Sequence, residues 1–97
     1  MADNYHSLRK VLDMAFMQAS SGKGYERHAK NEPFEKQIMM QITNSVGVGF
    51  PLGQALKKID ESMRLERDAA VRELLGAIVY TAGGILYLLQ GDNENIL

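Results

Sequence analysis

The residues best suited to bind a charged ligand lie in one short segment, Ser20-Ser21-Gly22-Lys23-Gly24-Tyr25-Glu26-Arg27-His28. Lys23, Arg27 and His28 can each donate to an anion, and the two glycines allow backbone amides to turn toward it. Arg27 can hold a phosphate with two donors at once, while the ring of Tyr25 offers a face on which a base can stack. The segment therefore predicts a phosphate or nucleotide site. The alternative is a solvated connection between two helices.

A second glycine-rich segment, Gly47-Val48-Gly49-Phe50-Pro51-Leu52-Gly53, runs into the start of a predicted helix. Free amides and the helix dipole favour anions at such a start. We therefore expect the amides near Gly49 and Gly53 to close the site, with Lys57 adding positive charge. The glycine spacing matches neither a Walker loop nor the dinucleotide fingerprint. A tight turn that lets two helices pack is the alternative.

The carboxylates raise the alternative of an enzyme. Glu32 and Glu35 form a Glu-x-x-Glu pair, and Glu73-Leu74-Leu75-Gly76-Ala77 resembles the Glu-Leu-Gly-Asp segment of the all-α nucleoside triphosphate pyrophosphohydrolases. The resemblance implies magnesium held by acidic pairs on antiparallel helices. The segment here has alanine where that family has its metal-binding aspartate. Glu66 and Asp68, which stand in place of the second pair, are two residues apart and diverge on a helix.

Covalent catalysis has few residues to draw on. The chain has no cysteine and two histidines, His6 and His28, and no Ser-His-Asp or Cys-His arrangement follows from the sequence. We therefore expect no catalytic residue, no metal site and no cofactor. The acidic side chains are interpreted as solvated helix faces.

Apolar periodicity predicts four helices that must position these segments. The expected start and stop signals are Asn31 or Glu32 before Pro33, Gly47 and Gly49 after Val46, and the acidic residues near Glu66. The expected helices span residues 4–19, 33–46, 51–63 and 66–90. The predicted fold is an all-α bundle of about four helices in a single domain, residues 1–97, with residues 91–97 as a flexible tail.

The last helix is apolar on every face from Leu74 to Leu89, a run of 16 residues. This run is shorter than the roughly 20 residues needed to cross a bilayer, so a buried helix is expected. Three other short helices can cover only part of it, which predicts a homo-oligomer. Gly76 and Gly83 lie two turns apart and, with Tyr80 and Tyr87, are the predicted oligomer interface. A tight crossing inside one chain is the alternative for the glycines.

The net charge and the composition restrict the classes of partner and the compartment that we expect. The formal net charge is −1, so no long-range attraction to nucleic acid polymers or anionic membranes is expected. The absence of cysteine suits a reducing compartment, and the polar segment Met1 to Lys10 has no apolar signal region. These features predict a cytoplasmic protein.

In size, and in Gly22-Lys23-Gly24-Tyr25-Glu26-Arg27-His28 and Gly49-Phe50-Pro51-Leu52-Gly53-Gln54-Ala55, the chain resembles the small accessory proteins of bacteriophages. Within that class, compact oligomers that sequester nucleotide immune signals recur. The resemblance implies an anti-defence protein of the host cytosol that holds a (cyclic) nucleotide at subunit interfaces without reacting it. The alternatives are a divergent pyrophosphohydrolase and an inhibitor that docks on a host protein.

Overall fold

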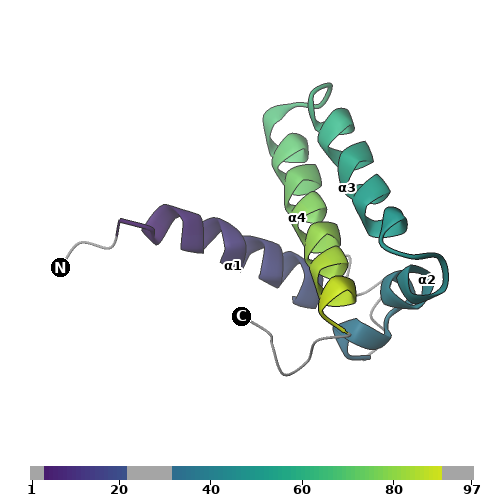
Figure 1. Ribbon diagram of the computed structural model, residues 1–97. Helices are drawn as coiled ribbons and strands as arrows, with labels where there is room; N and C mark the ends of the chain where they lie inside the picture. The colour runs from purple at the N-terminus through teal and green to yellow at the C-terminus, as the bar shows by residue number, and fades with distance from the viewer. Residues whose placement is uncertain (1–3, 22–31, 91–97) are drawn as a thin grey trace.

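The structure, a computed structural model, describes residues 4–21 and 32–90. In these residues it is entirely helical, which confirms the predicted small all-α bundle. The elements are α1 (His6–Ser21), the 3-10 turn η2 (Phe34–Lys36), α2 (Ile38–Val46), α3 (Gly49–Ser62) and α4 (Arg67–Leu89). Helices α3 and α4 form an antiparallel hairpin, α2 packs at its open end, and α1 projects sideways from α4 (Figure 1). The predicted tail, residues 91–97, lies outside the described residues.

The predicted second helix is interrupted at Gln37, so the expectation of one continuous helix from Pro33 was wrong. Gln37 has extended backbone angles, φ −72° and ψ 161°, which separate η2 from α2. Glutamine amides stabilise the break: the side chain of Gln37 donates to the carbonyl of Glu32 at 3.1 Å, and that of Gln41 donates to the carbonyl of Lys36 at 2.8 Å. Carbonyls left without helical partners are thereby hydrogen-bonded.

The turn between α2 and α3 depends on Gly47. Its φ of +99° is in the left-handed region that favours glycine, and its amide donates to the carbonyl of Thr43 at 2.7 Å to end α2. Helix α3 then begins at Gly49, two residues before the predicted start at Pro51. Pro51 fits the first turn of α3 because a proline lacks only an amide that the helix would leave unpaired.

Helix α4 begins where the acidic residues predicted it. Glu66 is its N-cap, and the two carboxylate oxygens accept from the amides of Asp68 at 3.0 Å and Ala69 at 2.7 Å. These hydrogen bonds favour the ionised carboxylate and lower the pKa of Glu66. One side chain thus satisfies two of the unpaired amides at the start of α4.

The glycines of α4 let other helices of the same chain approach closely. A methyl group at Gly83 would lie 2.8 Å from Cε of Met39 and 3.3 Å from Sδ of Met40, both in α2. At Gly84 it would lie 3.2 Å from Cδ2 of Leu52 in α3, and at Gly76 it would lie 3.1 Å from Cδ of Lys58. The inner face of α4 is therefore a surface of glycines closed by α2 and α3.

The core enclosed in this way is small. Among the described residues, the buried hydrophobic side chains are Ala15, Met40, Ala55, Leu75 and Ala77. Only two of them are larger than alanine. Helix α1 contributes Ala15 and is further attached by the amide of Gln18, which donates to the carbonyl of Arg72 at 3.2 Å.

Gly76 and Gly83 of α4 should respond differently to alanine. Each substitution stabilises the helix by about 1 kcal/mol through its higher helix propensity. The difference between the two variants therefore reports on the contacts of the added methyl group. Gly83→Ala pushes against Met39 and the fully buried Met40, whereas Gly76→Ala meets only the flexible side chain of Lys58. We expect the free energy of unfolding of Gly83→Ala to be lower than that of Gly76→Ala by about 1 kcal/mol, measured by urea unfolding. Equal stabilities would contradict close packing of α2 on Gly83.

Removal of the N-cap by Glu66→Ala should lower the melting temperature at pH 7. Because folding lowers the pKa of Glu66, its stabilisation is present above the ordinary glutamate value of about 4.3 and is lost as the pH falls through the lowered pKa. The difference in melting temperature between the wild type and Glu66→Ala should therefore shrink in acid. Glu35→Ala, at an exposed position in η2 with no side-chain cap, is the control and should keep the wild-type melting temperature at pH 7.

Candidate functional site

The predicted phosphate-binding segment begins directly after α1. Ser20 and Ser21 end that helix, and their hydroxyls donate to the carbonyls of Phe16 at 2.7 Å and Met17 at 2.9 Å. The next described residue is Glu32, just before η2. The four predicted ligand contacts in this segment, Lys23, Tyr25, Arg27 and His28, lie outside the described residues.

The other three predicted ligand contacts share one face of α3. Gly49, Gly53 and Lys57 are four residues apart and all exposed, and a methyl group at either glycine would meet no atom within 4 Å. Exposed glycines leave the helix backbone open to a ligand on this face. Lys57 has no ion pair with any described residue, so its charge is available there.

The start of α3 offers fewer free amides than the sequence suggested. The amide of Phe50 donates to the carbonyl of Gly47 at 3.3 Å, and that of Leu52 donates to the carbonyl of Val48 at 3.2 Å. Pro51 has no amide hydrogen. No side chain caps α3, and its first turn contains no acidic residue, so the charge at this end favours an anion. The donors left for a ligand are chiefly the Gly49 amide and Lys57.

Sequence reasoning missed that the adjacent Lys58 is held inside the hairpin. Its Nζ lies 3.5 Å from Oε2 of Glu73 and 5.8 Å from the ring centroid of Tyr80, and its alkyl chain crosses Gly76. The ring of Phe50 packs edge-on against Tyr80, with centroids 6.3 Å apart. Neighbouring residues on a helix point in different directions, which is why one lysine packs and the other stays exposed.

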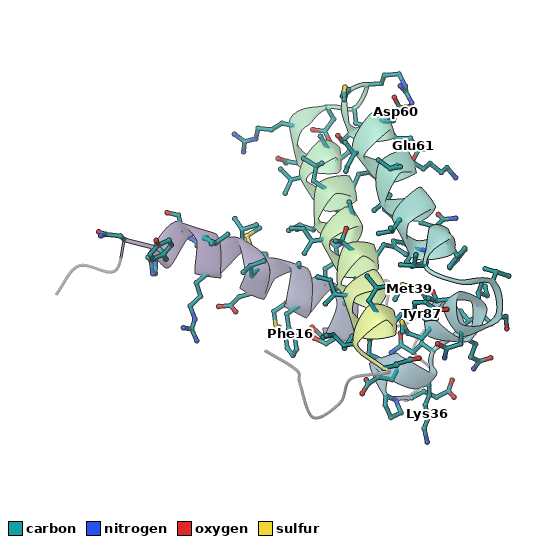
Figure 2. The ribbon with its side chains drawn as sticks, viewed as in Figure 1. Phe16, Lys36, Met39, Asp60, Glu61 and Tyr87 are labelled. Atoms are coloured by element: carbon teal, nitrogen blue, oxygen red, sulfur yellow. The ribbon has the colours of Figure 1, made fainter. Side chains whose placement is uncertain are left out.

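Most of the acidic residues in the second half of the chain have local partners. Asp60 pairs with Arg64 at 2.8 Å, and this hydrogen bond lowers the pKa of Asp60. Asp68 lies 3.4 Å from Arg67, and Glu66 caps α4. Across residues 4–21 and 32–90, no three His, Asp or Glu side chains come together as a metal site requires. Asp60 and Glu61 lie at the end of α3 nearest the hairpin turn (Figure 2).

The residues predicted for an oligomer interface pack largely within the chain. Gly76 and Gly83 face Lys58, Met39 and Met40, while Tyr80 contacts Phe50 and Lys58. Tyr87 is half-buried near the end of α4 (Figure 2). The glycine spacing therefore serves the tight crossing inside one chain, the alternative that the sequence left open. A second copy would have to meet the opposite face of α4.

Large apolar side chains remain uncovered on every helix. Among the described residues, nineteen large hydrophobic side chains are exposed, including Phe16 on α1, Leu56 on α3 and Ile85 on α4. Phe16 and Leu56 are each 67% exposed and Ile85 is 54% exposed. Exposed apolar side chains in this number offer surface on which another chain can pack.

By length and composition alone, α4 could also cross a membrane. Core helices of water-soluble proteins pass the same test, so this property does not assign a location. In the chain described here its glycine face is occupied by α2 and α3.

Comparison of the chain with family models, with curated proteins and with solved structures finds no match. Its function is therefore inferred from its own residues.

The two neighbouring lysines provide a test of this geometry. Lys58→Ala removes the alkyl chain over Gly76 and the partner of Glu73, so it should lower the free energy of unfolding by up to about 1 kcal/mol. Lys57→Ala removes an exposed side chain and should leave stability unchanged. Urea unfolding followed by circular dichroism compares the two. A larger loss for Lys57→Ala would contradict the described orientation of α3.

Proposed function

We propose that this chain forms a homo-oligomer that captures a small phosphorylated ligand, a (cyclic) nucleotide, and holds it without reacting it. The observation that carries the proposal is the segment Ser20 to His28, which begins in the last turn of α1 and has Lys23, Arg27 and His28 on either side of Tyr25 in the sequence. Such a set matches the two parts of a nucleotide, because cationic donors bind phosphate and an aromatic ring stacks on a base.

The exposed face of α3 supports the proposal with a second cationic surface. Gly49 and Gly53 leave the backbone accessible there, and Lys57 is unpaired among the described residues. The absence of acidic residues from the first turn of α3 keeps this end favourable to anions. In the proposed oligomer, this face and the segment after α1 line pockets between subunits.

The uncovered apolar surface supports self-association. Nineteen large hydrophobic side chains are exposed among the described residues, and packing against another copy would remove such side chains from water. An oligomer also places several copies of the same cationic segment in one particle. Capture without turnover removes one ligand per pocket, so the amount removed scales with the amount of protein. Such stoichiometric binding suits an anti-defence protein of a phage that lowers the free concentration of a host nucleotide signal.

Arg27→Ala should weaken nucleotide binding by about ten- to a hundredfold. This is the loss of about 1.5 to 3 kcal/mol expected for hydrogen bonds to a charged group. Titration calorimetry with cyclic and linear nucleotides measures the affinity. Arg64→Ala is the control, because its guanidinium is bound to Asp60 at 2.8 Å, and it should bind like the wild type.

The same titration separates the proposal from its alternatives. Nucleotide recovered intact after incubation with magnesium supports capture, whereas released pyrophosphate would identify a hydrolase. Unchanged affinity in Arg27→Ala would remove the proposed phosphate clamp. Failure of the wild type to bind any phosphorylated ligand, with a stable monomer in solution, would leave an inhibitor that docks on another protein.

A further inference from the structure

The outer face of α4 carries a regular apolar stripe. Its members alternate in steps of three and four residues: Val71, Leu74, Ile78, Thr81, Ile85 and Leu88. This 3.5-residue period is that of a coiled-coil seam, in which each side chain inserts between four side chains of a facing helix. The stripe, here called the α4 seam, runs for about 25 Å along the helix.

Five of the six seam residues are exposed in the described chain, and Ile78 is half-buried. Leu74 is 42% exposed, Ile85 is 54% exposed and Leu88 is 63% exposed. Gly76 and Gly83 occupy the opposite side of α4, where α2 and α3 pack. One face of α4 is therefore covered by α2 and α3 of the same chain. The opposite face, which is equally regular, has no partner helix among the described residues.

The one polar member of the seam is already satisfied. The hydroxyl of Thr81 donates to the carbonyl of Ala77 at 2.8 Å, one turn earlier in the same helix. Burial of Thr81 against another helix therefore leaves no unpaired donor and presents its methyl group to the contact. The whole seam can be desolvated without the cost of an unmet hydrogen bond.

The positions beside the seam are small or apolar and carry no charge. Ala70, Ala77 and Gly84 precede the seam residues on one side, and Leu75, Ala82 and Leu89 follow them on the other. Leu75, Ala77 and Gly84 are buried within the chain, so a second helix would meet Ala70, Ala82 and Leu89 beside the seam. A charged partner would find no counter-charge here, so the face fits an apolar helix with the same spacing.

We propose that the α4 seam pairs with the α4 seam of a second copy of the chain, in antiparallel orientation. Antiparallel pairing forms three kinds of layer: Val71 with Leu88, Leu74 with Ile85, and Ile78 with Thr81. Each layer joins a β-branched residue to a residue of different shape, and the two-fold axis passes between Ile78 and Thr81. The pair is self-complementary, as a two-fold interface requires.

The helix dipoles favour this orientation. Antiparallel pairing places the positive start of each α4 beside the negative end of the other, which aligns the helix dipoles favourably. Exposed apolar side chains also lie on α1, among them Leu8, Leu12 and Phe16, and the first test below separates that surface from the α4 seam.

The first test measures mass in solution by light scattering, on the full chain without nucleotide. The wild type should be a multiple of 10.8 kDa, and Ile85→Asp should reduce that mass at least twofold. Met63→Asp is the matched control: Met63 is 77% exposed at the end of α3, outside the seam, and its substitution should leave the mass unchanged. Circular dichroism should show equal helix content in all three.

Several outcomes would overturn the proposal. These are a wild type of 10.8 kDa, an Ile85→Asp variant that keeps the wild-type mass, or dissociation by Leu12→Asp on α1 but not by Ile85→Asp. Flotation of a monomeric wild type with phosphatidylcholine vesicles, abolished by Ile85→Asp, would assign the seam to a membrane instead.

The second test determines orientation. The chain has no cysteine, so Val71→Cys and Leu88→Cys each introduce one thiol. When the two variants are mixed, refolded together and oxidised, the disulfide between Cys variants at positions 71 and 88 should exceed either self-disulfide at least tenfold. In the antiparallel pair, two copies of the same position lie about 25 Å apart along the axis and cannot bond. Predominant self-disulfides, or none of the three, would overturn antiparallel pairing.

This inference rests on the self-association included in the proposed function and not on ligand binding. Because mass and disulfides are measured without nucleotide, loss of pairing and loss of nucleotide affinity are separate results. Nucleotide binding by a monomer would overturn the seam alone. Seam pairing without nucleotide affinity would overturn the ligand proposal alone.

Discussion

The structure depends on how a helix that is apolar on all sides is kept from water. In α4, Gly76 and Gly83 remove side chains from one face, so α2 and α3 can approach its backbone. That close approach closes the hairpin, but it buries little apolar area, because glycine and alanine contribute small surfaces. Leu74, Ile85 and Leu88 lie on the outer face of α4 and stay exposed. A tight crossing inside the chain and an uncovered seam outside it are thus two results of the same glycine spacing.

The polar contacts of the chain are arranged around this hairpin. Glu66 fixes the start of α4, Gln90 at its end donates to Asn44 of α2 at 3.2 Å, and Lys58 spans from α3 to Glu73. Each of these contacts is exposed or half-buried, so it orients the helices and adds little to the free energy of folding. These polar contacts orient the apolar contact between Met40 and Gly83, which lies between α2 and α4.

The sequence predicted the helices well because apolar spacing and capping residues are local signals. Glu66, Gly47 and Pro51 marked real boundaries to within two residues. The break at Gln37 was missed, since an extended residue inside an apolar period leaves no mark on that period. The sequence could not predict which helix the α4 glycines contact, because a spacing of seven residues permits close packing of a helix from the same chain or from another chain. Lys57 and Lys58 were indistinguishable until the rotation of α3 was known.

The antiparallel seam and the ligand proposal can be connected through α1. The side chain of Gln18, three residues before the end of α1, donates to the carbonyl of Arg72, next to Val71. In the proposed pair, Val71 faces Leu88 of the second copy, so the end of one α1 approaches the closing turn of the other α4. That turn is joined to α2 by the Gln90–Asn44 hydrogen bond, and α2 leads through Gly47 into the start of α3. Pairing along the seam would therefore bring Ser21, at the end of α1 in one subunit, toward the end of the partner hairpin at which α3 begins. The pocket between subunits in the proposed function requires this proximity.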